Sequence, residues 1–167
     1  MWTSLTKRVT VAAAAALVTA FAFSADAVAQ THLIEFPAGQ ACDFALGVDL
    51  GAGGPRNDHT FTDANGDTIR VLSTGVGNQL TFTNLSNGHT LTTRSNGAVT
   101  NTVYNPDGSQ TVTLIGHNVL FLFPTDVPSG PSTTLYVGRV VFQNSADLVS
   151  TLQSTSGTAT DICAALS

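Results

Sequence analysis

The chain has 167 residues and a formal net charge of −5, and 43% of its residues are hydrophobic but only 10% charged. This composition excludes intrinsic disorder, which requires low hydrophobicity and high net charge. Nucleic acid is also excluded as an expected partner, because six lysines and arginines against eleven acidic residues supply little of the positive charge that phosphate binding needs.

The first 29 residues have the pattern of a secretory signal peptide. Lys7 and Arg8 form a basic start, Val11–Phe23 is an uncharged apolar run, and Ala27–Ala29 is an A-x-A cleavage motif. The apolar run is shorter than the roughly 20 residues that span a bilayer. We therefore expect cleavage after Ala29, no membrane anchor afterwards, and a secreted, extracellular protein. A retained anchor is the alternative.

The expected mature chain consists of an N-terminal extension, residues 30–41, and a single domain, residues 42–167. It contains four arginines, no lysine, nine aspartates and one glutamate, a formal charge of −6. Threonine is abundant and suits the solvent face of a sheet. Short apolar runs alternate with turn signals about every ten residues, which is typical of an all-β, antiparallel β-sandwich, immunoglobulin-like or jelly-roll-like.

The mature chain has two cysteines, Cys42 and Cys163. In an oxidising compartment a single pair has one intramolecular connectivity, so a disulfide is expected between them. It would close a loop of about 120 residues and tie the two ends of the domain together. Two free buried thiols are the alternative.

The first strands are expected where apolar residues alternate with polar ones. Phe44–Leu50 is the clearest case, and Gly51–Pro55 after it is a flexible loop. A short strand is expected at 60–62. The turn Asp63–Asp67 then leads into a strand at 68–74.

A series of hairpins follows, with tight-turn dipeptides between short strands. The strands and the dipeptides that separate them are 80–85, Asn87-Gly88, a strand around Leu91, Asn96-Gly97, 99–104, Asp107-Gly108 and 112–115. Asn-Gly and Asp-Gly supply the positive φ angles that such turns need. Successive strands should therefore be antiparallel neighbours in a meander.

The C-terminal part begins with Val119–Phe123, five apolar residues in a row, which predicts a strand buried on both faces. A loop with three prolines follows. Thr133–Gln143 is the longest expected strand, with a bulge or bend near Gly138. Residues 147–152 alternate weakly. Asp161–Leu166 is expected to form a helical turn that Asp161 caps.

Two segments carry a resemblance to known proteins. The run GHNVLFLFPTDVPSGPSTTLYVGRVVF (residues 116–142) and the ending DICAALS resemble segments of uncharacterised small secreted proteins of high-GC Gram-positive bacteria. The resemblance implies secretion and an all-β fold. It implies no site.

Histidines are the first place to look for catalysis. A Ser-His-Asp hydrolase would need one of His32, His59, His89 and His117, but the sequence has no G-x-S-x-G nucleophile motif. Their turn and loop contexts are typical of ordinary surface histidines. His117 is the one to examine first, because it precedes the apolar strand and its ring is a candidate for desolvation.

Asp63, Asn65 and Asp67 have the spacing of oxygen ligands that opens a calcium loop. Gly66, however, stands at the fourth place instead of the sixth, and the twelfth place is Thr74 instead of Glu. The same residues form an ordinary Asn-Gly turn flanked by acids, which is the interpretation that we favour. Calcium binding is kept as a hypothesis.

Other site chemistries are weakly indicated. A glycosidase needs two facing carboxylates, and the only glutamate, Glu35, precedes Cys42. Carbohydrate binding through stacked rings has only Tyr104 and Tyr136 in the mature chain, which lacks tryptophan. We therefore predict no cofactor and no catalytic residue. The preferred interpretation is a non-catalytic binding or envelope-associated structural protein, and the alternative is a small secreted hydrolase with a histidine-centred site.

Overall fold

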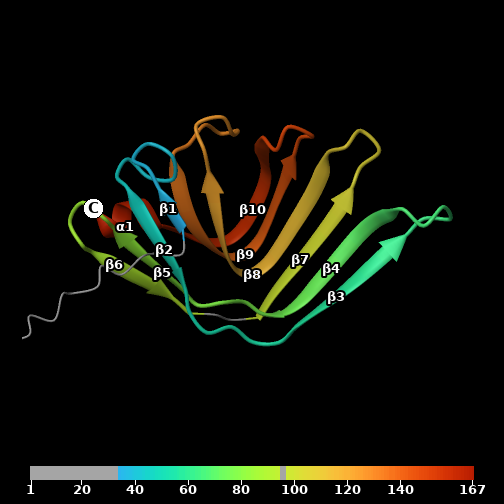
Figure 1. The fold of residues 1–167 in the computed structure, drawn as a ribbon, viewed down its shortest axis with the longest axis horizontal. Coiled ribbons are helices and arrows are strands. Elements are labelled where there is room, and N and C mark those ends of the chain that lie inside the picture. The colour runs from blue at the N-terminus through green and yellow to red at the C-terminus, as the bar shows by residue number, and fades with distance from the viewer. Residues whose placement is uncertain (1–33, 95–96) are drawn as a thin grey trace, which may run out of the picture. The chain divides into compact units, whose positions relative to one another are not determined.

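Ten strands and one short helix make up the described part of the chain, residues 34–94 and 97–167 of a computed structural model (Figure 1). The chain divides into two units, Met1–Gln30 and Thr31–Ser167, and the architecture below belongs to the second. The expected signal peptide, its cleavage site after Ala29, His32 and Asn96 lie outside the described residues.

The strands form two antiparallel sheets, which confirms the all-β, two-sheet class. The smaller sheet has the order β1-β2-β5-β6 and the larger one β10-β9-β8-β7-β4-β3. The elements are β1 (Ile34–Phe36), β2 (Leu46–Leu50), β3 (Arg56–Thr62), β4 (Thr68–Val76), β5 (Leu80–Asn84), β6 (Thr90–Thr93), β7 (Gly97–Tyr104), β8 (Gln110–Leu122), β9 (Ser132–Asn144), β10 (Ser150–Asp161) and α1 (Ile162–Leu166).

The hairpin prediction is partly confirmed and partly wrong. The strands β7, β8, β9 and β10 do form a meander, and β5 pairs with β6. The expected pairing of β6 with β7 is wrong, because the chain changes sheet between them and β7 pairs with β4 and β8. The expected strands 112–115 and 119–123 are one strand, β8, and β1 brings part of the expected N-terminal extension into the smaller sheet.

Gly116 lies between the two strands expected from the sequence, and it belongs to a row of residues that crosses the larger sheet. In register across five neighbouring strands stand Gly75 in β4, Ala98 in β7, Gly116 in β8, Gly138 in β9 and Gly157 in β10. We call these five residues the glycine row. Figure 1 shows β8, β9 and β10 curving about halfway along their length. The bend expected near Gly138 is therefore shared by neighbouring strands.

Close backbone contact explains why glycine stands at two positions of the row. Gly138 has φ +149°, and a Cβ there would lie 2.1 Å from the Ser156 carbonyl oxygen. Gly157 has φ +98°, and a Cβ there would lie 2.2 Å from the Val137 carbonyl oxygen. Both conformations are rare for residues with a side chain, and both sites lack room for one.

Alternate residues of β8 lie in two separate apolar environments, one on each face of the strand. On one face, Val119 and Phe121 pack against a core formed by the smaller sheet and α1, where Phe82 is fully buried. The Phe121 ring centroid lies 5.1 Å from that of Phe36 and 6.4 Å from that of Phe82. On the other face, Leu120 and Leu122 are buried with Val140. The prediction of a strand buried on both faces is confirmed.

The first core is closed by the C-terminal segment. The disulfide Cys42–Cys163 is present, with the two Cα atoms 5.5 Å apart, as the sequence predicts. Nearby, the fully buried Thr133 donates a hydrogen bond from Oγ1 to the Ala41 carbonyl oxygen at 2.8 Å. Asp161 caps α1 by accepting from the Ala164 N–H at 3.0 Å, which confirms the predicted helical turn.

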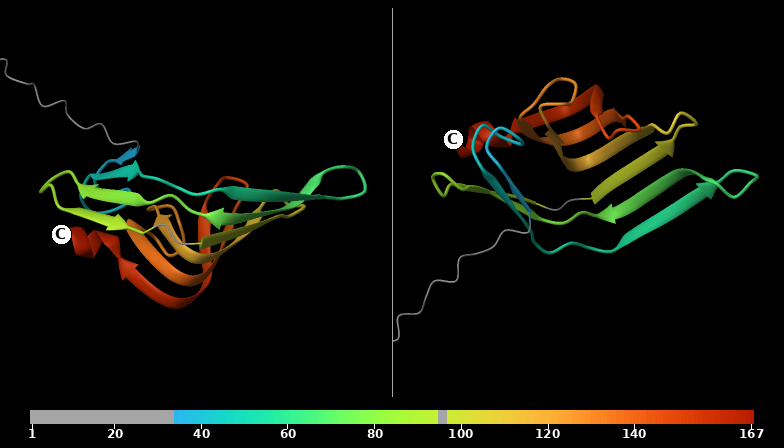
Figure 2. Two further views of the ribbon diagram at one scale, coloured as in Figure 1. Left: turned by 90° about the horizontal axis from the view of Figure 1, so that it is seen from below. Right: turned by 45° about the horizontal axis from the view of Figure 1, so that its top comes forward.

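The two edge strands of the larger sheet are strongly exposed. All seven residues of β3 are exposed, and so are residues 153–161 of β10. Both views in Figure 2 show β10, in red, at the outer margin of its sheet. The second half of β10, residues 154–161, has no apolar alternation and was not expected from the sequence. No helix in the described ranges is long and apolar enough to cross a membrane.

Candidate functional site

The calcium candidates Asp63, Asn65 and Asp67 form the turn between β3 and β4. Asp63 Oδ1 accepts hydrogen bonds from the backbone N–H of Asn65 at 2.8 Å and of Asp67 at 3.0 Å. The hydrogen bond from Asp67, and to a smaller extent that from Asn65, lowers the pKa of the Asp63 carboxyl group below its usual value. The geometry is that of an Asx turn, in which one aspartate oxygen binds the local backbone. Calcium binding there stays a hypothesis.

The described histidines lie in three different elements. His59 is exposed on β3 and lies opposite Leu72 of β4. His89 is in the β5–β6 turn, where its Nδ1 lies 3.3 Å from Asn87 Nδ2. His117 is half-buried on β8, opposite Val137 and next to the glycine row. The fold therefore does not gather these three histidines into one site.

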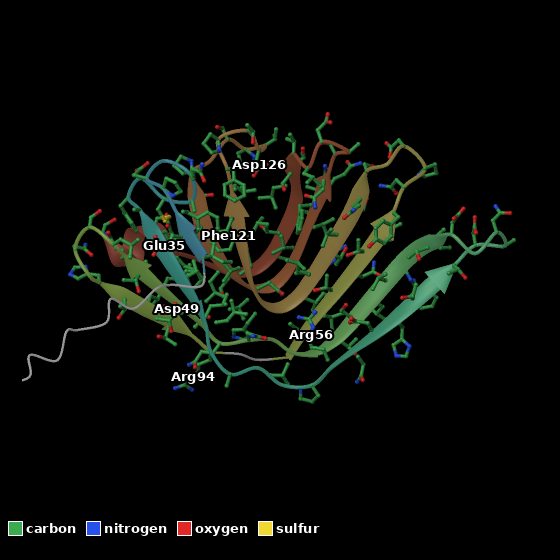
Figure 3. All side chains as sticks on the ribbon, in the orientation of Figure 1. Glu35, Asp49, Arg56, Arg94, Phe121 and Asp126 are labelled. Atoms are coloured by element: carbon green, nitrogen blue, oxygen red, sulfur yellow. A yellow bond between two sulfur atoms is a disulfide. The ribbon has the colours of Figure 1, made fainter. Side chains whose placement is uncertain are left out.

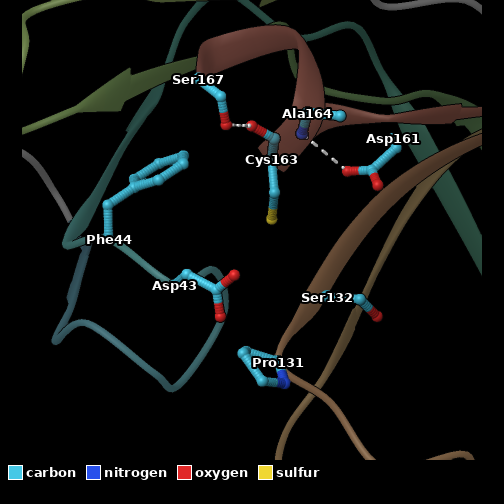
Figure 4. A pocket seen from close by; sticks show the side chains of 8 residues that line it. All are labelled: Asp43, Phe44, Pro131, Ser132, Asp161, Cys163, Ala164 and Ser167. Atoms are coloured by element: carbon cyan, nitrogen blue, oxygen red, sulfur yellow. Dashed lines mark hydrogen bonds between the residues drawn. The ribbon is translucent and has the colours of Figure 1, made fainter.

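One pocket lies beside the disulfide, at the start of α1 (Figure 4). It has a volume of about 300 Å³ and is lined by Asp43, Phe44, Pro131, Ser132, Asp161, Cys163, Ala164 and Ser167. Figure 4 shows the Asp161 carboxylate bonded to Ala164 and the Ser167 hydroxyl bonded to the Cys163 carbonyl oxygen, so both groups serve the helix ends. Four of its eight lining residues are acidic or carry a hydroxyl group, and the others include Phe44 and Pro131.

A second pocket, of about 390 Å³, lies at the opposite end of β9 and contains a tight hydrogen-bond network. Ser109 is 6% exposed, and its hydroxyl donates to Asp107 Oδ1 at 2.6 Å. The same hydroxyl oxygen accepts from Gln143 Nε2 and Asn105 Nδ2, both at 3.0 Å. The Ser109 hydroxyl contact, followed by the Ser109 N–H, lowers the pKa of Asp107. With its donor and its lone pairs engaged, Ser109 is held as a structural group and is not poised as a nucleophile.

A third pocket, of about 430 Å³, is formed by Gln40, Phe123, Pro124 and Thr125. None of these three pockets is lined by a histidine. The acidic residues Glu35 on β1, Asp49 on β2 and Asp126 in the loop after β8 come from different elements (Figure 3). The first two pockets mix polar and apolar groups, whereas the third is mainly apolar.

Asp126 is a structural residue that the sequence did not single out. It is 4% exposed, and its two oxygens accept from the Phe123 N–H at 2.7 Å and the Ser150 N–H at 2.8 Å. It thereby fastens the proline-containing loop to the first residue of β10. The hydrogen bond from Phe123, three residues earlier, is local, but the one from Ser150 depends on the fold.

The same loop covers one end of the β10 edge. Val127 N–H donates to the Ser150 carbonyl oxygen at 2.8 Å, and Leu152 N–H donates to the Val127 carbonyl oxygen at 2.7 Å. From Ser154 onward, the described residues place β9 alone beside β10. This stretch of edge backbone, Ser154–Thr160, is exposed and is paired on one side only.

Comparison of the chain with protein-family models, with curated proteins and with solved structures finds no match.

Proposed function

We propose that this protein is secreted and non-catalytic, and that it serves a binding or envelope-associated structural role through the surface of its larger sheet. The observation that carries the proposal is the exposure of that sheet: β3 and the second half of β10 are exposed along their whole length. Edge strands offer rows of backbone donors and acceptors, and other chains can pair with them.

The covalent structure supports a role outside the cytoplasm. The Cys42–Cys163 disulfide joins residues 121 positions apart, and such bonds persist in oxidising compartments. The resemblance of the segment 116–142 to small secreted proteins of high-GC Gram-positive bacteria agrees with export. The proposal includes removal of residues 1–29 as a signal peptide.

The experiment expresses the full chain with its own N-terminus in a Gram-positive host and fractionates the culture. We expect the protein in the medium or the envelope fraction, with Gln30 as its first residue by mass spectrometry. The mature protein is then treated with a fluorophosphonate probe, which labels activated serines. An uncleaved cytoplasmic protein contradicts the secretion part of the proposal, and stoichiometric labelling that His117→Ala abolishes supports the hydrolase instead.

A further inference from the structure

We propose that the exposed edge of β10 pairs with β10 of a second copy, antiparallel and centred on Gly157, so that two larger sheets join into one. This inference deepens the proposed function and rests on it, because it names the partner that the sheet surface binds. The segment involved is Ser154–Thr160, which we call the open edge.

The first argument is that the open edge lacks the features by which proteins protect edge strands. Natural sheets guard their edges with charges, prolines, bulges or covering loops. Residues 150–160 contain no charged residue and no proline. The covering loop reaches only to Leu152, and the one register irregularity of this strand lies between Leu152 and Ser154, before the open edge begins.

The opposite edge of the same sheet shows the contrast. Strand β3 carries Arg56, Asp58 and His59 along its exposed length, and its register shifts between Phe61 and Thr62. Charges and a bulge are common devices against edge pairing. We therefore assign the self-pairing edge to β10, not to β3.

The bend selects the partner and its direction. Because the larger sheet bends at the glycine row, a strand added beside β10 must bend at the same place and toward the same side. A second β10, related by a two-fold axis through the Gly157 pair and perpendicular to the sheet, satisfies both conditions. The glycine row then continues from Gly138 and Gly157 into Gly157 and Gly138 of the second copy. A parallel arrangement about an axis along the strand would instead oppose the two bends.

The register that follows is chemically favourable. It places Ser154 opposite Thr160, Thr155 opposite Ala159 and Ser156 opposite Thr158 of the second copy. Hydroxyl pairs across antiparallel strands can hydrogen-bond and stabilise the pairing. All of these residues are exposed in the single chain, so they are available to a second copy.

The expected complex is weak. Seven residues on each side form an interface near or below the roughly 1,200 Å² at which stable complexes begin. Each backbone hydrogen bond contributes about 0.5–1.5 kcal/mol net. We therefore expect a dimer whose population rises with protein concentration.

The test is sedimentation velocity of the mature, disulfide-bonded chain over roughly a hundredfold range of concentration. The double variant Thr155→Lys/Ala159→Lys places lysine opposite lysine at two symmetric pairs, and we expect its dimer dissociation constant to rise by more than about tenfold. The variant Thr155→Lys/Ala159→Glu places lysine opposite glutamate at the same pairs and should restore the dimer. Residues 155 and 159 face Val140 and Tyr136 of β9, so the substitutions meet no charge directly across from them within one chain.

A matched control adds the same charge as the double-lysine variant, but at the opposite edge strand, β3. Asn57→Lys/Thr60→Lys adds two lysines to β3, and the dimer should persist. Circular dichroism of each variant confirms that it is folded. A wild-type chain that is monomeric throughout, a double-lysine variant that still dimerises, or a charge-reversed variant that stays monomeric overturns the inference. A monomeric, exported protein without probe labelling contradicts this inference alone, whereas retention in the cytoplasm or serine labelling contradicts the proposed function.

Discussion

The glycine row makes a sharp prediction about stability, because the same substitution has different costs at different glycines. At Gly138, alanine meets two penalties. The φ angle of +149° is unfavourable for any residue with a side chain, at a cost of about 1–3 kcal/mol. The new Cβ would also lie 2.1 Å from the Ser156 carbonyl oxygen, so β9 and β10 must separate locally, at a further cost of about 1–3 kcal/mol.

Two other glycines separate these penalties. Gly66 has φ +93° with no atom within 4 Å of a Cβ, so Gly66→Ala has only the conformational cost. The φ angle of Gly77 lies outside the positive range that residues with a side chain avoid. A Cβ there would meet only the Ala98 Cβ, at 3.8 Å. Gly77→Ala should therefore be neutral or stabilise by up to about 1 kcal/mol, since it restricts the unfolded chain.

The assay is reversible urea unfolding of the mature chain with its disulfide intact. We expect the free energy of unfolding to fall by about 2–6 kcal/mol for Gly138→Ala and by about 1–3 kcal/mol for Gly66→Ala, with Gly77→Ala at or above wild type. A loss at Gly138 no larger than the loss at Gly66 would refute the claim that strand contact at the bend requires glycine. Equal effects at all three sites would refute the conformational argument as well.

Four further predictions concern the covalent link, the loop, acid and calcium. Replacing Cys42 and Cys163 together by alanine should lower the free energy of unfolding by about 4–5 kcal/mol, measured by the same urea titration, because the link of separation 121 restricts the unfolded chain. Asp126→Asn leaves one backbone N–H facing an amide donor and should cost about 2–3 kcal/mol, with earlier proteolysis in the loop as a second readout. The lowered pKa values of Asp63 and Asp107 mean that their carboxylates favour the folded state above pH 3.8 and lose that effect as the pH falls below it; Asp→Asn at either site should make acid unfolding shallower there. Because Asp63 Oδ1 already accepts two backbone hydrogen bonds, the melting temperature should be the same in calcium and in chelator. A higher melting temperature in calcium would support calcium binding at this turn.

Much of the fold follows from local patterns in the sequence. The alternation in Phe44–Leu50 predicts β2, and its inward residues Leu46 and Val48 are indeed buried. The uninterrupted apolar run at 119–123 predicts a strand between two apolar layers, and both layers are present. Asp161 caps α1 because a short acceptor before an apolar turn is a local signal.

Long-range features escaped prediction for a physical reason. The pairing of β7 with β4 depends on where the chain changes sheet, and a turn dipeptide at 96–97 carries no information about that choice. Gly116 resembles a break between two strands, because its neighbours across the sheet, Ala98 and Gly138, are far away in sequence. Only the register shows that these residues form one row.

The candidate site also contains some features that local sequence predicts and others that depend on the fold. The turn geometry of Asp63 could be predicted, because its hydrogen-bond partners lie within four residues. The hydrogen bond from the Ser150 N–H to Asp126 could not, because the two residues are 24 positions apart in the sequence. The open edge of β10 could not either, because Ser154–Thr160 is polar on both faces and lacks the period that identifies a strand. Its pairing with β9 supplies the order that its own sequence does not indicate.

The bend of the larger sheet bears both on how its apolar side chains are buried and on how its outer strand, β10, is exposed. The bend brings Leu120 together with Val140, which pairs with Leu114 on the other side of the glycine row. Alternation of side chains along β8 places Phe121 on the opposite face, in the core under the smaller sheet. A flat sheet of the same strands would need a further layer to cover each face. The arrangement leaves β10 as the last strand of the bend, with β9 beside it and its outer backbone directed to solvent. A strand of matching curvature is needed to extend such a sheet without straining it, and β10 of a second copy has that curvature.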